Sequence, residues 1–305
     1  MLINKEEMTC RFSLPKDKSI ILHNDDCLTG MDSYPDNHFD VIVTSPPYNL
    51  GISYNTYDDA TPRDDYLKWL EKVAIKIKQK MKDDGSFFLN MGAAPRSPWG
   101  PFEVALLLRS HFELQNIIHW VKSIYVENES YGRKVSLNVG HYKPINSNRF
   151  LNDGHEYIFH FTKKGDVALD RLSIGVPYKD IGNIRRWKNG HNGIRCRGNC
   201  WYIPYKTIRS HSKERPHPAS FPAELAEKCI LLHGLKDEMT VLDPFMGIGN
   251  TSIACCKLKI NCVGFEIDKA YYTENIRVLA THCMKSRSVG LESRSHVFKD
   301  TRNAP

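Results

Sequence analysis

Asp40-Val41-Ile42-Val43-Thr44-Ser45-Pro46-Pro47-Tyr48-Asn49 is the stretch that decides the fold. Its first four residues are mostly β-branched and contain no turn former, which predicts a short buried strand. The two prolines that follow fix two backbone angles and remove two N–H donors, so a rigid corner presents its carbonyls and side chains. Such a corner suits a site in which a carbonyl and the Ser45 hydroxyl hold one exocyclic amino group while the Tyr48 ring stacks on a planar substrate. Taken alone, the stretch also fits a strand that ends in an ordinary polar turn.

A second stretch, far downstream, is typical of a strand, a glycine-rich turn and a helix: Thr240-Val241-Leu242-Asp243-Pro244-Phe245-Met246-Gly247-Ile248-Gly249-Asn250-Thr251-Ser252. Gly247 and Gly249 let the backbone approach a ligand closely, and the three polar residues after them are candidate helix caps. The next predicted strand, residues 261–268, carries Glu266 near its end, where a carboxylate accepts the hydroxyls of a nucleoside ribose. The GxGxxG fingerprint is absent and no lysine follows the glycine pair, so a nucleoside without a pyrophosphate fits better than NAD or ATP.

Together the two stretches resemble the amino-methyltransferases of DNA, whose marks are an (Asp/Asn/Ser)-Pro-Pro-(Tyr/Phe) catalytic turn and a Phe-x-Gly-x-Gly cofactor turn. The catalytic turn comes first here and the cofactor turn last, as in the permuted β group of that family. The resemblance covers about residues 19–282 and implies an α/β, Rossmann-like fold for S-adenosylmethionine-dependent methyl transfer. That fold is a doubly wound, mostly parallel and circularly permuted sheet with a target-recognition insert. The strand at Leu242 would lie beside the strand at Val43, so that Ser45 and Gly247 face each other.

The resemblance also implies roles for individual residues. Asp26, in the turn after the predicted strand at 19–23, matches an acid near the adenine of the cofactor, although it also fits an Asx turn that caps the next helix. Ser220 and Phe221 lie where the chain of the family passes the methionine end of the cofactor. The expected catalytic residues are Ser45, Pro46, Pro47 and Tyr48. The expected S-adenosylmethionine contacts are Asp26, Cys27, Thr44, Ser220, Phe221, Asp243, Phe245, Gly247, Gly249, Asn250, Thr251 and Glu266.

The chemistry implied by these roles depends on positioning and electrostatics. The lone pair of an aromatic amino nitrogen is delocalised into the ring, so acceptors for both amino hydrogens must aim it at the methyl group. We expect the Ser45 hydroxyl oxygen and the Pro46 carbonyl to be these acceptors, with the base turned out of the duplex. Serine in the first position is typical of the cytosine-N4 enzymes of the family, whereas Asp or Asn is typical of adenine-N6 enzymes. We expect cytosine-N4, and adenine-N6 stays as the alternative because pocket shape also decides the base.

Basic residues are concentrated in the middle of the chain. Residues 120–215 contain 18 Lys and Arg against 8 Asp and Glu, whereas the remainder contains 24 against 27. This excess indicates a polyanion partner, which the resemblance makes double-stranded DNA; a solvated basic face is the alternative. Two inserts that flank a predicted scaffold strand at about 153–162 would supply target recognition. The expected DNA contacts are Arg185, Arg186, Trp187, Lys188, Arg195 and Arg197.

Cysteine and histidine usage indicates free thiols rather than a metal site. The nearest approach to a zinc pattern, formed by His191, Cys196, Cys200 and His211, has poor spacing, so no metal is expected. The nine cysteines are scattered, and we find neither a secretory leader nor an apolar run long enough to span a membrane. We therefore expect a reducing intracellular compartment, the cytoplasm and its nucleoid.

The expected organisation has four segments: a catalytic half at 19–122, a target-recognition region at 123–210, a cofactor half at 211–284 and a solvated tail at 285–305. Between the motifs, periodicity predicts helices at 66–81, 102–108 and 269–282 and strands at 86–90 and 117–121. The protein would act as a monomer or homodimer, with a cognate restriction endonuclease as a candidate partner. An inactive cofactor-binding reader of nucleic acid, or an enzyme acting on RNA or on a protein amide, remains an alternative.

Overall fold

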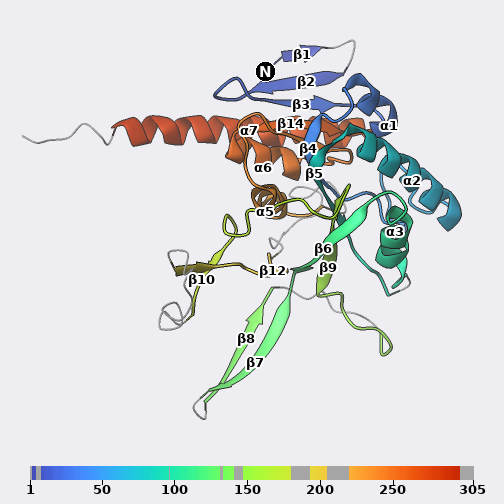
Figure 1. Ribbon diagram of the computed structural model, residues 1–305, viewed down its shortest axis with the longest axis vertical. Coiled ribbons are helices and arrows are strands. Elements are labelled where there is room, and N and C mark those ends of the chain that lie inside the picture. The colour runs from blue at the N-terminus through green and yellow to red at the C-terminus, as the bar shows by residue number, and fades with distance from the viewer. Residues whose placement is uncertain are drawn as a thin grey trace, which may run out of the picture.

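A ten-stranded sheet is the centre of the computed structural model of the protein (Figure 1). The structure describes residues 2–4, 8–95, 97–130, 133–140, 147–179, 193–204 and 220–295. From one edge to the other, the strands are β1 (Leu2–Asn4), β2 (Thr9–Ser13), β3 (Ser19–His23), β14 (Asn261–Phe265), β13 (Thr240–Asp243), β4 (Phe39–Thr44), β5 (Met81–Met91), β9 (His155–Thr162), β6 (Glu113–Val121) and β12 (Cys200–Tyr202).

Most of this sheet is parallel. Strands β3, β14, β13, β4 and β5 pair in parallel, and β12 pairs in parallel with β6. Strand β9 is antiparallel to both of its neighbours, β5 and β6. Val241 pairs with Val41 and Leu242 with Ile42, which confirms the expected adjacency of the two motif strands. The last two strands of the chain therefore lie between its first core strands, which is the permuted arrangement.

Helices cover both faces of the sheet (Figure 1). One face carries α1 (Cys27–Gly30), the 3-10 turn η1 (Met31–Ser33), α2 (Arg63–Lys80) and α3 (Gly100–Leu108), and the other carries α5 (Ala223–His233), α6 (Asn250–Leu258) and α7 (Lys269–Ser295). Alternate residues of β4 serve the two cores: Val41 and Val43 pack with α5 and α6, whereas Ile42 packs with α2. The predicted doubly wound fold is confirmed.

Three features differ from the expected boundaries. Strand β2 precedes residue 19 and pairs with β3, because Cys10 and Phe12 alternate into the core. Strand β12 lies inside the region expected to serve recognition, and its Trp201 is 1% exposed, so this part belongs to the scaffold. Helix α7 continues past residue 282 to Ser295, into the expected tail, since the sequence there contains no proline to end it.

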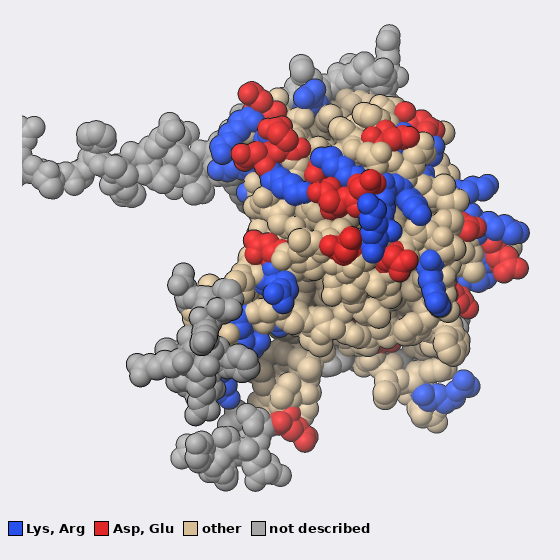
Figure 2. Space-filling model, in the orientation of Figure 1, with Lys and Arg blue, Asp and Glu red and all other residues tan. Residues whose placement is uncertain are grey.

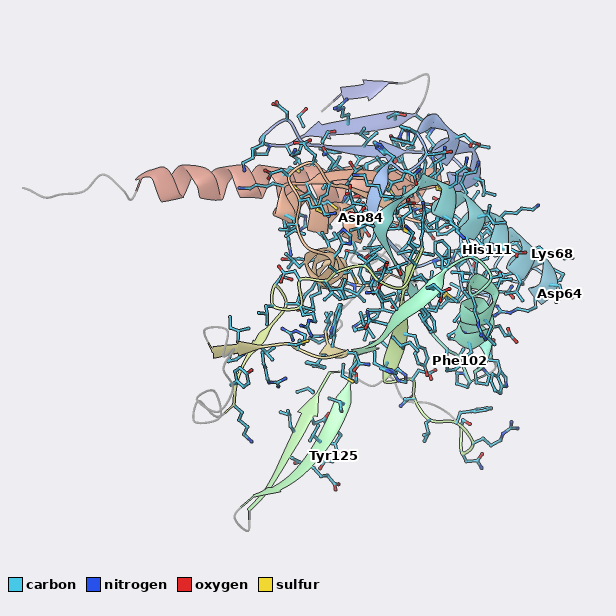
Figure 3. All side chains as sticks on the ribbon, in the orientation of Figure 1. Asp64, Lys68, Asp84, Phe102, His111 and Tyr125 are labelled. Carbon is cyan, nitrogen blue, oxygen red and sulfur yellow. The ribbon has the colours of Figure 1, made fainter. Side chains whose placement is uncertain are left out.

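The region after β6 projects away from the sheet. Strands β7 (Ile124–Ser130) and β8 (Arg133–Val139) form an antiparallel hairpin, with Tyr125 53% exposed on it (Figures 1 and 3). A second small ribbon joins β10 (Val176–Pro177) to β11 (Ile194–Arg195). Basic and acidic side chains are interspersed over the upper half of the face in Figure 2. None of the helices in the described part of the chain has the length and apolar composition needed to cross a bilayer.

Two buried histidines share one serine in the core. His160 Nε2 and His233 Nδ1 lie 3.0 Å and 2.9 Å from the Ser86 hydroxyl oxygen, and His160 also stacks on Phe88. Burial, reinforced by mutual repulsion with His233, lowers the pKa of His160 to about 3. Burial likewise lowers the pKa of His233 to about 4. Both imidazoles are therefore neutral in the folded protein at pH 7.

We expect this pair to reduce stability in acid. The unfolded chain binds the histidine protons near pH 6.5, whereas the folded chain binds them only near pH 3 to 4, so stability is lost progressively as pH falls below 6.5. Between pH 7 and pH 5 the loss is roughly 2 kcal/mol for each histidine. Denaturant unfolding of wild type and of a His160→Gln, His233→Gln double variant checks it. Carboxyl groups with raised pKa values change stability in the opposite sense, but they are present in both the wild type and the double variant. If the difference in free energy of unfolding between these two proteins does not change with pH, the prediction is wrong.

Candidate active site

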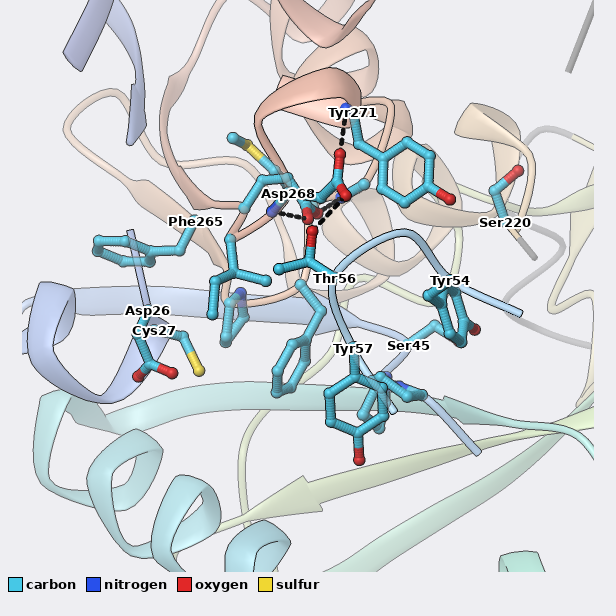
Figure 4. A pocket seen from close by; sticks show the side chains of 18 of the residues that line it. Asp26, Cys27, Ser45, Tyr54, Thr56, Tyr57, Ser220, Phe265, Asp268 and Tyr271 are labelled. Carbon is cyan, nitrogen blue, oxygen red and sulfur yellow. Dashed lines mark hydrogen bonds between the residues drawn. The ribbon is translucent and has the colours of Figure 1, made fainter. Parts of the chain in front are cut away.

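A pocket opens at the carboxyl ends of the central parallel strands, where β4 and β13 lie side by side and lead to helices on opposite faces. Figure 4 shows side chains that line this pocket. The segments that follow four of the strands line the pocket: residues 25–27 after β3, 45–48 after β4, 244–247 after β13 and 266–268 after β14. Ser45 and Gly247, which are 202 positions apart in the sequence, both line this pocket. The sheet therefore brings the two motif turns together.

Most of the expected site residues line this pocket. They are Asp26, Cys27, Ser45, Pro46, Pro47, Tyr48, Ser220, Phe221, Phe245, Gly247, Asn250 and Glu266. The Asp26 side chain also accepts the Leu28 backbone N–H at 2.7 Å and caps α1, which confirms the capping interpretation; its contact with the adenine of a cofactor stays a prediction.

Four expected cofactor residues do not line the pocket. Asp243 is 1% exposed and accepts hydrogen bonds from the Thr44 and Thr251 hydroxyls, both at 2.6 Å. Burial raises the pKa of Asp243 to about 6, against the lowering effect of these two bonds. The trio ties β4, β13 and α6 together behind the pocket. Gly249 has φ +88° and packs so closely on Asn275 that an added Cβ would lie 1.9 Å from its Oδ1. These residues support the cofactor turn from behind.

The cofactor turn is held by Glu266. Gly247, with φ +51°, donates its backbone N–H to Oε2 of Glu266 at 2.9 Å, and the Asp268 N–H donates to Oε1 at 2.8 Å. Burial raises the pKa of Glu266 to about 7, although these two bonds lower it. A carboxylate in this position still has lone pairs to offer to hydroxyl groups of a ligand.

Sequence reasoning missed the loop that lies over the pocket. The buried Asp59 carboxylate accepts backbone N–H groups of Asn49, Leu50 and Ile52 at 2.9 to 3.0 Å and so fixes the loop. Thr56 donates to Asp268 Oδ2 at 2.5 Å and connects the loop to the end of β14 (Figure 4). This loop and its surroundings add to the lining Tyr54, Thr56, Tyr57, Trp69, Asp268 and Tyr271. The signal available in the sequence was a polar loop with two tyrosines directly after the catalytic turn.

The catalytic turn is rigid. The Tyr66 hydroxyl donates to the Pro47 carbonyl at 2.7 Å, whereas none of the described residues donates to the Pro46 carbonyl. The Ser45 hydroxyl oxygen lies 2.7 Å from the Tyr48 hydroxyl oxygen and 3.3 Å from the Asn90 backbone carbonyl. In the described part of the chain the Pro46 carbonyl therefore stays open to a further donor, and the Ser45 hydroxyl lies beside it in the same turn.

The expected DNA contacts are only partly described. Arg195 is exposed on β11, and Arg197 donates from Nε to the Ile174 carbonyl at 2.9 Å. Arg185, Arg186, Trp187 and Lys188 lie outside the described residues, as do His191 and His211. Cys196 and Cys200 are free and exposed, and the part of the chain that the structure describes contains no group of three or more metal-ligating side chains. The absence of a metal stays a prediction.

Comparison with known proteins identifies the family that this chain matches. The family model of the N6/N4 DNA methylases matches residues 39–277. The type II methyltransferase M.BglII of Bacillus subtilis is 25% identical over 276 residues, which are 88% of this chain and 71% of the relative.

Solved structures share the fold. The PvuII DNA methyltransferase, described as cytosine-N4-specific, superposes with a TM-score of 0.61 at 17% identity over 84% of this chain and 85% of its own. TTHA0409 of Thermus thermophilus, solved in complex with S-adenosyl-L-methionine, gives a TM-score of 0.55 at 22% identity over 86% of this chain and 93% of its own. The architecture of these methyltransferases is the architecture of this chain.

Proposed function

The chain belongs to the family of DNA methylases that modify base amino groups at N6 or N4, and on that premise we propose that it methylates N4 of cytosine in double-stranded DNA. The methyl donor is S-adenosylmethionine. The observation that carries the proposal is the shared pocket: the catalytic turn at Ser45 and the cofactor turn at Gly247 line the same space.

The side chains of the pocket suit this cofactor. Among the described residues, four carboxylates line it and no Lys, Arg or His does: Asp25, Asp26, Glu266 and Asp268. Carboxylates accept hydrogen bonds from hydroxyl and amino groups and favour a positively charged sulfonium, whereas four acidic side chains would repel a pyrophosphate. Aromatic and apolar residues complete the lining, among them Phe245, Phe265 and Ile267. We assign the cofactor to this side of the pocket, with Glu266 on the ribose.

The chain itself positions the target base. S-adenosylmethionine, when bound, would supply an electrophilic methyl group and leave as S-adenosylhomocysteine, and the methylated nitrogen would lose one proton to solvent. The Ser45 oxygen and the Pro46 carbonyl accept the two amino hydrogens, which directs the nitrogen lone pair out of the ring plane and toward that methyl group. The Tyr48 ring lines the same pocket and offers a stacking face. A base inside a duplex cannot reach this position, so the target nucleotide must be flipped out.

Serine at position 45 favours cytosine over adenine. A hydroxyl is a weaker acceptor than the carboxylate or amide typical of adenine-N6 enzymes, and the PvuII enzyme with which this chain shares its fold is cytosine-N4-specific. Adenine-N6 methylation on the same fold is the alternative, and an inactive cofactor-binding reader is a more distant one. The similarity to type II methyltransferases also favours a restriction-modification role. We propose a cognate endonuclease as partner and a monomer or homodimer as the active form.

Expression in a host that lacks amino-methyltransferases tests the choice of base. Total DNA from that host is digested to nucleosides and separated by mass, with the Ser45→Ala variant as the matched control. We expect N4-methylcytosine from the wild type only. N6-methyladenine instead would overturn the cytosine assignment and keep the family, whereas two unmodified samples would favour the reader.

Cofactor affinity should depend on pH through Glu266. Its ionised form accepts the ribose hydroxyls, and its pKa of about 7 means that it becomes protonated as pH falls from 8 to 6. We expect the Kd for S-adenosylmethionine to rise about tenfold over that range, following the ionised fraction. Titration calorimetry at pH 6, 7 and 8 checks this. Glu266→Gln should bind weakly at every pH, and a wild-type Kd that is equal at pH 6 and 8 contradicts the assignment.

A further inference from the structure

A buried carboxylate lies behind the catalytic turn. Glu156 is the second residue of β9, the strand that runs antiparallel to its neighbours, so its beginning lies at the carboxyl ends of β5 and β6. Its side chain reaches Tyr48 and Asn90, and the residue is 8% exposed. Gly92 makes room for this approach, because an added Cβ there would lie 3.2 Å from the Glu156 carboxyl carbon and 2.9 Å from the Tyr48 ring.

Both oxygens of Glu156 are engaged. Oε2 accepts the Asn90 side-chain amide at 2.7 Å and the Tyr48 hydroxyl at 3.1 Å. Oε1 accepts Lys122 Nζ at 3.0 Å, and this lysine is itself only 16% exposed in its side chain. A carboxylate paired with a lysine accepts hydrogen bonds and does not donate them.

Because the Glu156 carboxylate only accepts, it determines which atom donates in each hydrogen bond of the cluster. The Tyr48 proton goes to Glu156, so the Tyr48 oxygen is left to accept from Asn90 Nδ2 and from the Ser45 hydroxyl, both at 2.7 Å. Ser45 has one proton, and its two acceptors here, the Tyr48 oxygen and the Asn90 carbonyl, keep that proton within the cluster. Asn90 Nδ2 also approaches the Ser45 oxygen at 3.5 Å, so one of its two lone pairs is left for a substrate amino group.

The same polarity orients the Asn90 side chain. Because its Nδ2 is directed at Glu156 and Tyr48, its Oδ1 is fixed as an acceptor, and this buried oxygen has no protein partner among the described residues. An orphaned buried acceptor beside Ser45 is costly unless a ligand donates to it.

We propose that Glu156 is a positioning residue for methyl transfer: it acts through Tyr48 and Asn90 to present Ser45 as a hydrogen-bond acceptor. This inference rests on the proposed function. A simpler role, in which Glu156 only pairs with Lys122 and stabilises the end of the sheet, predicts loss of stability without a specific loss of the chemical step.

Glu156→Gln separates the two roles, since it keeps the size of the side chain and replaces one acceptor by a donor. With enzyme in excess of DNA and saturating S-adenosylmethionine, we expect the single-turnover rate to fall on the order of 10- to 100-fold, with unchanged Kd for the cofactor. Asp40→Asn is the matched control. Asp40 is also a buried carboxylate, 2.8 Å from Lys82 Nζ, but it lies near the amino end of β4, away from the pocket.

Two further variants test the polarity itself. The double variant Asn90→Asp, Glu156→Gln exchanges donor and acceptor between the side chains at positions 90 and 156. Its single-turnover rate of methyl transfer should be higher than that of either single variant. Lys122→Met removes the donor to Oε1 but leaves Oε2 to accept from Asn90 and Tyr48, so transfer should slow less than it does in Glu156→Gln.

Methyl transfer to DNA by the wild-type protein tests the proposed function. The single-turnover rates of the variants relative to the wild type test the role of Glu156. A wild-type rate in Glu156→Gln would overturn the proposal. An equal loss in Asp40→Asn, or a Glu156→Gln defect that appears only in cofactor binding or thermal stability, would also overturn it.

Discussion

Replacing Ser45 by alanine is expected to slow methyl transfer by about 100-fold or more, a cost of the size seen when one preorganised hydrogen-bonding partner is removed from an active site. The base would still bind, but one amino hydrogen would lose its acceptor and the nitrogen lone pair would stay delocalised. Single-turnover transfer measures the chemical step, and calorimetry should show an unchanged Kd for S-adenosylmethionine.

Ser110→Ala is the matched control for this variant. Ser110 is exposed at the end of α3, where its hydroxyl donates to the Leu107 carbonyl, and its loss should not alter transfer. If Ser45→Ala transfers methyl at the wild-type rate, the serine has no role in aligning the amino group and the catalytic turn must be reassigned.

Gly247→Val is expected to abolish detectable cofactor binding, which means a loss of at least about 100-fold in affinity, or about 2.7 kcal/mol. Gly247 lines the pocket at φ +51°, a conformation that a β-branched residue strongly disfavours. The added side chain would also occupy the space through which a ligand approaches the turn, and a rearranged turn would withdraw the N–H that Glu266 accepts.

Gly198→Val is the control that distinguishes damage to the binding site from general backbone strain. Gly198 also has a positive φ, of +83°, but an added Cβ there would meet no atom within 4 Å, and it is outside the pocket. Thermal unfolding of both variants should show comparable folded proteins, with the cofactor-induced rise in Tm lost only in Gly247→Val. If Gly247→Val binds S-adenosylmethionine with wild-type affinity, the turn at Gly247 does not hold the cofactor.

The sequence was sufficient for the fold because the decisive residues are local. The β-branched strand at 41–43 and the strand at 240–243 carry periodicity and turn signals that survive without tertiary context, and their adjacency followed from the family that they resemble. Strand β12 was missed because three residues, Cys200–Tyr202, are too few to show a period; its pairing with β6 and the burial of Trp201 reveal it.

The site was predicted less completely, for a physical reason. Thr44, Asp243 and Thr251 lie in the motifs, yet their polar groups satisfy one another inside the protein, and a motif does not distinguish a residue that faces the ligand from one that supports it. Glu156 and Asn90 are 66 positions apart and meet only because β9 returns antiparallel beside β5. No local sequence pattern predicts such a pair.

The most direct test of the central claim is transfer by the purified protein from methyl-labelled S-adenosylmethionine to mixed-sequence double-stranded DNA, with RNA and a protein mixture in parallel. After digestion, we expect label in the DNA alone, as N4-methylcytosine, and none with Ser45→Ala or Gly247→Val. Label in RNA or protein, or the absence of label in all three despite tight cofactor binding, would contradict the account.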